Sequence, residues 1–267
     1  MSLNKTELLN RCAGGDEETR LVLARALDKL ETAERRSIPA HTPFLSPAQR
    51  SAVEGLIHAA GNPRHLFTGG YEGAERTVCV FLPDWLEETD WPAGEHPLAA
   101  LQLSAPAGAK LSHRDWLGSI LGLGLSREKI GDLLAEENRC QAVVLAETAD
   151  ILRSQLDKAG RYPVKAASLA LEELTAPERS VKLIRDTFAT LRLDAVAASA
   201  FSLPRAKAAS LIAAGRVSLN HVECVKPDRL VTEGDVLTCR GFGKCVVKSV
   251  GGQSKKGRIM AELERYV

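Results

Sequence analysis

Basic side chains gather in the last third of this chain, where few acidic residues accompany them. Lysine and arginine carry the charge and the N–H donors that bind phosphate oxygens, so this enrichment predicts a polyanionic ligand. Six basic residues and one amide between residues 191 and 244 are the candidate contacts: Arg192, Arg205, Lys207, Arg216, Asn220, Arg240 and Lys244.

The net charge of +1 conceals this uneven distribution. From Val181 to the end, 15 Lys and Arg accompany 8 Asp and Glu, a net charge of +7, whereas residues 1–180 carry −6. The polyanion-binding face is therefore expected in the C-terminal region.

Two short amphipathic helices are expected to position the basic side chains. The first has an apolar stripe with the i, i+3, i+4, i+7 spacing, formed by Leu193, Val196, Ala197 and Ala200. The second is expected to begin with a capping Ser202 and Pro204 and to end at Gly215. On this second helix Arg205 and Lys207 flank the apolar face from opposite sides, so both can reach one ligand.

Strand signals follow the second helix. Val217 and Leu219 alternate with polar residues, and Gly234-Asp235 indicates a turn before a strand at 236–238. This succession resembles the S-four RNA-binding domain, a small helix–helix–hairpin module. The positions that carry the resemblance are Arg192-Leu193-Asp194, Arg205, Ala208, Leu211-Ile212, Gly215, Val217, Asn220 and Gly234-Asp235.

Several positions in this region leave alternatives open. Pro204 stands where the resembling module commonly has serine, and His221 where it commonly has glycine. Asp194 is expected either to cap the first helix or to brace Arg205. Asn220 is suited either to contact a base or sugar or to satisfy its own turn.

The middle segment, residues 93–178, has the order of a split βαβ unit. Strands are expected at 98–103, 130–134, 141–145 and 164–171, with helices at 112–121 and 147–158. This is the βαββαβ order of ferredoxin-like domains, which RNA-recognition-motif (RRM) domains share. The central strands carry no aromatic residue. The aromatic stacking platform of such domains is therefore absent, and base-specific readout by this sheet is not expected.

The N-terminal segment, residues 1–92, mixes helices and strands. Gly69-Gly70-Tyr71 with Glu75-Arg76 is its one candidate site, either a backbone approach to phosphate or a structural hairpin with an ion pair. Because the lysine and hydroxyl of a P-loop are missing, we interpret this stretch as structural.

Motifs spread along the chain are similar to those of the bacterial YlmH-like family: HTPFLSPAQR, GGYEGAER, LSHRDWLGSILGLGLSREKIGDLL and VKPDRLVTEGDVLTCRGFGK. The resemblance implies an RRM-like middle domain, a C-terminal S-four domain and no catalysis. It also implies cytosolic association with the large ribosomal subunit in ribosome-associated quality control, in which members steady a tRNA. Genes of this family often lie among cell-division genes.

Motifs for enzymatic chemistry are missing from the sequence. The six histidines show no HExxH spacing, and no GxSxG or post-strand GxGxxG occurs. The six cysteines form no CxxC pair, so free thiols are expected rather than a zinc site. We therefore expect a protein that is not an enzyme and needs no cofactor or metal.

These observations predict an α+β, multidomain, cytoplasmic RNA-binding protein with parts at 1–92, 93–178 and 179–267. Its expected partners are structured ribosomal RNA, tRNA and the large ribosomal subunit, and we expect a monomer. No apolar run reaches the roughly 18–20 residues of a membrane span, so no membrane association is expected. Two alternatives remain: an RNA-modifying enzyme with an unrecognised site in the middle domain, and a cell-division interaction factor.

Overall fold

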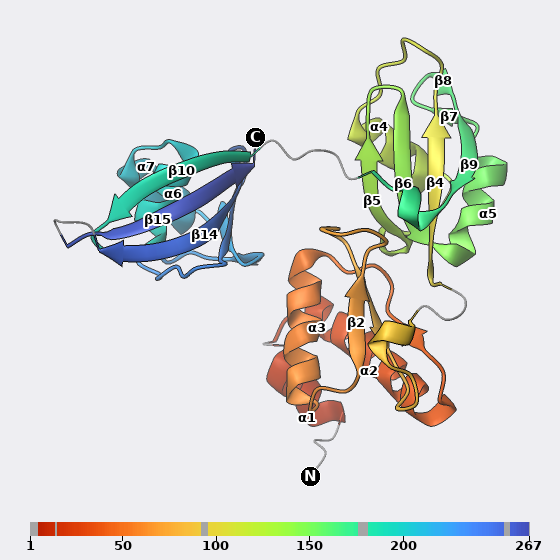
Figure 1. Cartoon of the computed structure of the whole chain (residues 1–267), viewed down its shortest axis with the longest axis horizontal. Coiled ribbons are helices and arrows are strands. Elements are labelled where there is room, and N and C mark those ends of the chain that lie inside the picture. Colours follow the sequence, from red (N-terminus) through yellow and green to blue (C-terminus); the bar gives the residue numbers. More distant parts are fainter. Residues whose placement is uncertain (1–4, 14, 92–95, 176–180, 254–256, 267) are drawn as a thin grey trace. The chain divides into compact units, whose positions relative to one another are not determined.

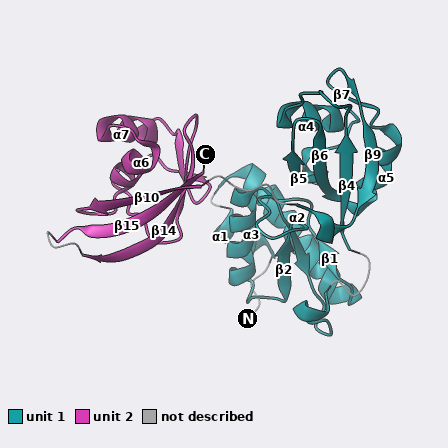
Figure 2. Cartoon of the chain, turned by 45° about the horizontal axis from the view of Figure 1, so that its top comes forward, with its two compact units in different colours: residues 1–177 teal, residues 178–267 magenta. Residues whose placement is uncertain are grey.

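The computed structural model describes residues 5–13, 15–91, 96–175, 181–253 and 257–266 (Figure 1). The chain divides into two compact units, residues 1–177 and residues 178–267 (Figure 2). The boundaries expected after residues 92 and 178 fall in two stretches outside the described residues. Whether residues 1–92 and the middle region fold separately stays a prediction.

The first part of unit 1 packs three helices against a small antiparallel sheet with strand order β1-β3-β2. Its elements are α1 (Lys5–Cys12), α2 (Glu17–Arg36), β1 (Ala40–His41), α3 (Pro47–Ala59), β2 (His65–Thr68), β3 (Val78–Phe81) and the 3₁₀ turn η1 (Glu88–Asp90). Helix α2 starts where Asp16 accepts a hydrogen bond from the Thr19 N–H, and α3 starts at a capping box of Ser46 and Gln49.

The second part of unit 1 is a four-stranded antiparallel sheet with two helices. It comprises β4 (Leu98–Ser104), α4 (His113–Leu121), η2 (Arg127–Lys129), β5 (Ile130–Ala135), β6 (Arg139–Leu145), α5 (Ala146–Gln155), the hairpin β7 (Lys158–Ala159) and β8 (Tyr162–Pro163), β9 (Lys165–Leu169) and η3 (Leu171–Glu173). The sheet order β5-β6-β4-β9 is the ferredoxin-like order. Trp116, Ile120 and Leu152 from both helices share one buried cluster on one face of this sheet.

The opposite face of this sheet is covered by the N-terminal part. Val143 and Leu145 of β6 pack in one buried cluster with Phe44 and Val80. Gly131 of β5 lets the Phe44 ring approach, because a Cβ at Gly131 would lie 2.6 Å from a ring carbon of Phe44. The face on which RRM domains stack bases is therefore partly an internal core, which explains why its strands carry aliphatic residues.

The loop at 69–76 docks on β5 and has a structural role. Asp132 accepts hydrogen bonds from the Tyr71 hydroxyl at 2.8 Å and from the backbone N–H of Glu75 at 2.7 Å. Arg76 donates to the carbonyls of Ile130 and Phe44, each at 3.1 Å. Burial lowers the pKa of Arg76 to about 10, assisted by the neighbouring charge of Arg127. The structural interpretation is confirmed, although Arg76 binds carbonyls of other elements rather than Glu75.

Unit 2 is a six-stranded antiparallel sheet with strand order β10-β15-β14-β13-β11-β12 and two helices on one of its faces (Figure 1). Its elements are β10 (Val181–Phe188), α6 (Leu193–Phe201), α7 (Arg205–Ala213), β11 (Val217–Leu219), β12 (Val222–Glu223), β13 (Val236–Cys239), β14 (Gly243–Gln253) and β15 (Ile259–Tyr266). The predicted apolar stripe of α6 is confirmed, since Leu193, Val196, Ala197 and Ala200 are all buried.

The junction between α6 and α7 differs from the expectation. Ser202 does not cap α7; it ends α6 in the left-handed conformation, with φ of 55°. Its N–H donates to the Ser199 carbonyl and the Leu203 N–H to the Ala198 carbonyl, so both amides close the helix that precedes them. Pro204 lies at the N-cap of α7 instead of in its first turn. Gly215 follows the end of α7 at φ 66°, as predicted.

Candidate RNA interface

Asp194 joins two of the predicted basic residues in unit 2. Its carboxylate accepts hydrogen bonds from Arg192 Nε at 3.2 Å and from Arg205 Nε and Nη2, both at 3.1 Å. The Asp194 side chain is 8% exposed, whereas that of Arg205 is 59% exposed. One buried carboxylate therefore fixes the stems of two guanidinium groups and leaves part of each open to solvent.

The charges of this cluster decide the protonation of Asp194. Burial raises the pKa of its carboxyl, but the hydrogen bonds and charges of Arg192 and Arg205 outweigh burial, so the pKa of Asp194 is lowered. The hydrogen bond to Asp194 raises the pKa of Arg192. With one carboxylate between two guanidinium groups, the cluster keeps a net positive charge that suits a phosphate group.

The N-terminus of α6 is capped by backbone groups rather than by Asp194. The N–H groups of Leu193 and Asp194 donate to the carbonyls of Arg229 at 2.8 Å and Pro227 at 3.0 Å. The expectation that Asp194 braces Arg205 is confirmed, and the alternative that it caps α6 is wrong.

The loop that caps α6 brings two basic residues that the sequence analysis missed. Lys226 and Arg229 are exposed on the segment whose carbonyls bind the first turn of α6, close to Arg192. Their proximity depends on contacts between residues more than 30 positions apart. The only available signal in the sequence was their basic character within VKPDRL.

Helix α7 displays Lys207 beside Arg205. The apolar side chains of Ala208, Leu211 and Ile212 are buried, while Arg205 and Lys207 are exposed, as the helical pattern predicts. Within the described part of the chain, Lys207 forms no ion pair, so its ammonium group is available to a ligand.

Arg216 and Arg240 form a second basic pair at the end of α7. The Arg240 N–H donates to the Arg216 carbonyl at 3.0 Å, and Arg216 Nη2 donates to the Arg240 carbonyl at 3.1 Å. Lys244 lies on the same β13–β14 hairpin as Arg240, with its Nζ 5.4 Å from the centre of the Tyr266 ring. The structure thus brings together Arg192 with Arg205 and Arg216 with Arg240, and records no contact between these two pairs.

Asn220 is engaged in its own turn. With φ of 51° at Asn220 and 67° at His221, both residues adopt the left-handed conformation of a tight hairpin between β11 and β12. Asn220 Nδ2 donates to Asp235 Oδ1 at 2.7 Å, and its Oδ1 accepts from the Val236 N–H at 2.8 Å. The side chain therefore holds two turns together, and a contact of Asn220 with RNA stays a prediction.

Exposed apolar side chains accompany the basic residues of this loop region. Val222 is 62% exposed, Val225 52% and Leu230 63%. Leu230 pairs with Arg192 in an isolated β-bridge, so it lies beside the Asp194 cluster. Apolar groups among cations can contact ribose rings or base faces, in addition to the phosphate contacts that the cations make.

Among the described residues, no three His, Cys, Asp or Glu side chains gather as metal ligands. All six cysteines are free thiols, and burial raises the pKa of Cys79, Cys140 and Cys245 to about 12. Among the same described residues, no helix has the length and apolarity required to cross a bilayer.

The fold and the basic face define an RNA-binding class of protein, and family models agree. The model described as "Putative RNA-binding domain in YlmH" matches residues 97–173, and the model of the S4 domain matches residues 191–237. These two regions are the ferredoxin-like part of unit 1 and the α6–β13 part of unit 2.

A curated relative places the chain in one family. The ribosome-associated protein quality control protein P2 of Bacillus subtilis (strain 168) is 35% identical over 230 residues, which cover 84% of this chain and 86% of the relative. The chain therefore belongs to the YlmH family. A solved structure described as the cell division protein ylmH from Streptococcus pneumoniae has a TM-score of 0.50 and 22% identity, covering 60% of this chain and 96% of that one. This second likeness supports the fold alone.

Proposed function

We propose that this protein binds structured ribosomal RNA and tRNA at the large ribosomal subunit, without catalysing a reaction, in ribosome-associated quality control or assembly. One observation carries the proposal: buried Asp194 presents Arg192 and Arg205 together on an exposed face of an S4 domain. The name of the curated relative supports the ribosomal setting. The protein then acts in the cytoplasm, as a monomer.

The basic residues contact the RNA backbone as two groups. Arg192, Arg205 and Lys207 contact phosphates first, because two of them are pre-oriented and the third has no competing ion pair among the described residues. Arg216, Arg240 and Lys244 extend the contact along the hairpin. Such contacts supply affinity without reading sequence, so the target is recognised by the shape of its backbone.

Exposed apolar residues and the hairpin that Asn220 holds supply the remaining contacts. Val225 and Leu230 lie where a ribose or an unpaired base can meet them once the phosphates are bound. Asn220 sets the hairpin that holds β11 and β12 in position. This division resembles that of other RNA-binding modules, in which cations give affinity and neutral groups select the RNA structure.

Co-sedimentation with purified ribosomal subunits tests the proposal. The full chain should pellet with the large subunit and much less with the small one. The Arg205→Ala/Lys207→Ala variant should lose most of this binding, because each phosphate contact contributes to the electrostatic free energy of association.

A matched control separates a site effect from a charge effect. Arg185→Ala/Lys248→Ala also removes two positive charges from unit 2, from side chains that already pair with Glu262 and Glu264. This control should bind the large subunit nearly as wild type. Equal binding by both variants, or binding to neither subunit by the wild type, would contradict the proposed role.

A further inference from the structure

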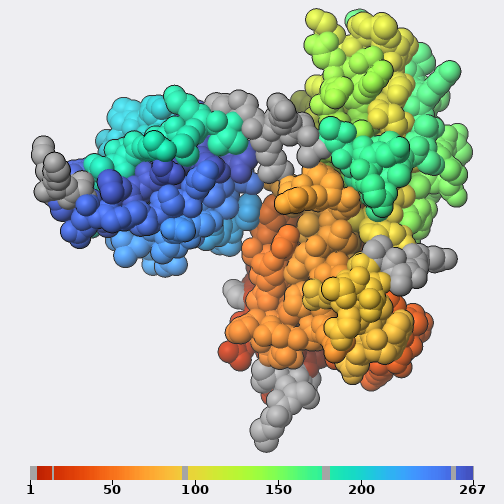
Figure 3. All heavy atoms as spheres, viewed as in Figure 1, coloured from red at the N-terminus to blue at the C-terminus, as the bar shows by residue number. Residues whose placement is uncertain are grey.

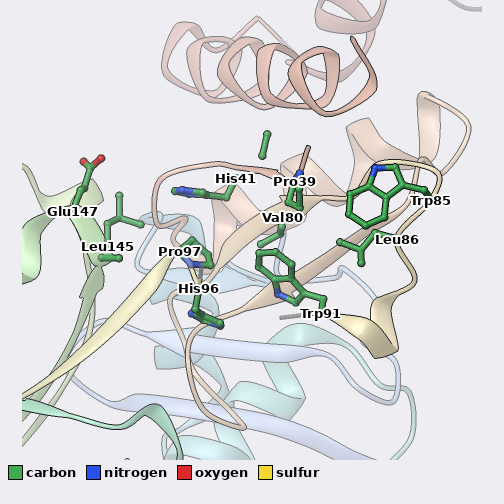
Figure 4. Close-up of a pocket in the computed structure, with 12 residues that line it drawn as sticks. Pro39, His41, Val80, Trp85, Leu86, Trp91, His96, Pro97, Leu145 and Glu147 are labelled. Carbon is green, nitrogen blue, oxygen red and sulfur yellow. The ribbon is translucent and has the colours of Figure 1, made fainter. Parts of the chain in front are cut away.

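A cavity of about 590 Å³ lies in unit 1, far in sequence from the S4 domain. Its walls come from both parts of the unit: Trp85, Leu86 and Trp91 from the η1 region, and His96, Pro97 and Glu147 from the middle part (Figure 4). More of its lining is apolar than polar. The proposed RNA interface uses none of these residues.

Two of the three tryptophans of the chain line this cavity. Trp116 is fully buried in the middle core, whereas Trp85 is 65% exposed. The Trp85 indole N–H donates to the Ser37 carbonyl at 2.9 Å, which fixes the ring with its surface open to solvent. The Trp91 ring lies 6.1 Å from the His96 ring, at 34°. Burial lowers the pKa of His96, which favours a neutral imidazole beside the Trp91 ring.

The segment that carries both tryptophans is acidic. Residues 84–91 contain four exposed acids and no basic residue: Asp84, Glu87, Glu88 and Asp90. Glu87 pairs with Arg64, while Asp84, Glu88 and Asp90 form no ion pair within the described residues. None of these four acids lines the cavity itself, whereas Glu147 does and is paired with Lys129. The four acids lie on the segment that contributes both lining tryptophans. These charges repel phosphates and attract cations, so the cavity suits a basic ligand rather than RNA.

We propose that this cavity binds a short, lysine- or arginine-rich segment of a partner protein that packs one apolar side chain against the cavity lining of Trp85, Leu86 and Trp91. An oriented, exposed tryptophan is the kind of residue that dominates binding at protein interfaces. The flanking basic side chains of the segment face Asp84, Glu88 and Asp90 and can also lie over the indole rings. Binding here is independent of the S4 domain, so either proposal can fail without the other.

The indole N–H signals of the full-length protein in a ¹⁵N NMR titration test this proposal. Trp85→Phe and Trp91→Phe variants assign the signals, and Trp116 serves as the internal reference. The probe is a synthetic peptide of eight lysines around a central leucine–proline pair. The signals of Trp85 and Trp91 should shift saturably while that of Trp116 stays in place.

Two peptide controls and two protein variants complete the experiment. Replacing the leucine–proline pair by glycine–serine, or the lysines by glutamates, should abolish the saturable shift. Asp84→Lys/Glu88→Lys should weaken the affinity about tenfold or more, since it reverses two exposed charges on the segment that carries both lining tryptophans. Glu136→Lys/Glu137→Lys makes the same charge change on the exposed β5–β6 turn and should leave most of the affinity intact.

Three outcomes would overturn the proposal. The first is an absence of shifts with the lysine peptide up to millimolar concentration. The second is an equal response to the glycine–serine peptide, which would indicate charge attraction without an apolar site. The third is a saturable shift of Trp85 and Trp91 with hexauridylate, which would assign the cavity to RNA.

Discussion

Asp194 contributes to both the stability and the presentation of the basic face. Its carboxylate is nearly buried. It accepts hydrogen bonds from the guanidinium groups of Arg192, which precedes α6 in the chain, and of Arg205, which begins α7. Without its charge, Arg192 and Arg205 would repel each other and lose their orientation. The residue that orients two of the proposed RNA contacts is therefore an acid, which a search for basic residues alone would discount.

The Asp194→Asn variant should lower the free energy of unfolding of unit 2. Hydrogen bonds to charged groups contribute about 1.5–3 kcal/mol, and this change weakens several of them at once. All three tryptophans lie in unit 1, so fluorescence does not report on unit 2. The amide signals of α6 and α7, followed by NMR through a urea titration, measure the change. Asp228→Asn, an exposed neutralisation in the same unit, should stay within about 0.5 kcal/mol of wild type.

The ionised Asp194 carboxylate also makes the free energy of unfolding of unit 2 depend on pH. The pKa of Asp194 is lower in the folded state than the value of about 3.9 in an unfolded chain, so the unfolded state binds more protons between these values. The stabilisation is complete about one pH unit above the unfolded pKa, near pH 5, and is lost as the pH falls through the folded pKa. Wild type and Asp194→Asn should therefore converge in stability as the solution is acidified. A difference that persists unchanged at low pH would contradict the ionic account.

Helices α6 and α7 show which parts of an element can be predicted from sequence. The buried positions Leu193, Val196, Leu211 and Ile212 follow from helical spacing, and Gly215 from its freedom at positive φ. The role of Ser202 was misjudged because a serine between two helices can serve either one. Only the hydrogen bonds from the N–H groups of Ser202 and Leu203 back to carbonyls of α6 show that it closes this helix.

Contacts between distant elements lie beyond such patterns. The docking of Tyr71 and Arg76 on β5, and the packing of Phe44 against Gly131, join residues about 50 to 90 positions apart. One sequence signal was available: Ala142, Val143, Val144 and Leu145 are apolar at every position, which indicates a strand buried on both faces. It did not reveal which element covers the second face.

The close approach at Gly131 gives a prediction for unit 1. Gly131→Ala should destabilise this unit by about 1–3 kcal/mol, because the new methyl group forces the Phe44 ring to move. Gly118→Ala, on the exposed face of α4, should instead stabilise by about 0.5–1 kcal/mol, because a Cβ there meets no atom within 4 Å beyond its chain neighbours and its own helix backbone. Thermal unfolding followed by tryptophan fluorescence measures both. Equal effects of the two changes would contradict the packing described for β5.

The two units of the molecule carry opposite charge. The basic residues counted from Val181 onward belong to unit 2. Figure 3 shows this unit mainly from the side of β10, β14 and β15. Helices α6 and α7 lie on the other face of that sheet (Figure 1). Unit 1 has a net negative charge, and its cavity is lined by two tryptophans that belong to an acidic segment. This separation supports the phosphate contacts proposed for unit 2, although the region matched by the putative RNA-binding domain model, residues 97–173, lies in the acidic unit 1. Charge counts gave it from sequence alone, whereas the cavity required the fold.

The salt dependence of binding to the large ribosomal subunit tests the central claim most directly. Wild type and Arg205→Ala/Lys207→Ala would be compared by co-sedimentation across a potassium chloride series, beside Arg185→Ala/Lys248→Ala. Each lost phosphate contact should reduce the slope of log affinity against log salt concentration by about 0.7–0.9, so the first variant should flatten it by roughly 1.4–1.8. The control should keep the wild-type slope. An unchanged slope for Arg205→Ala/Lys207→Ala would mean that these side chains do not contact phosphates, and the proposed interface would be wrong.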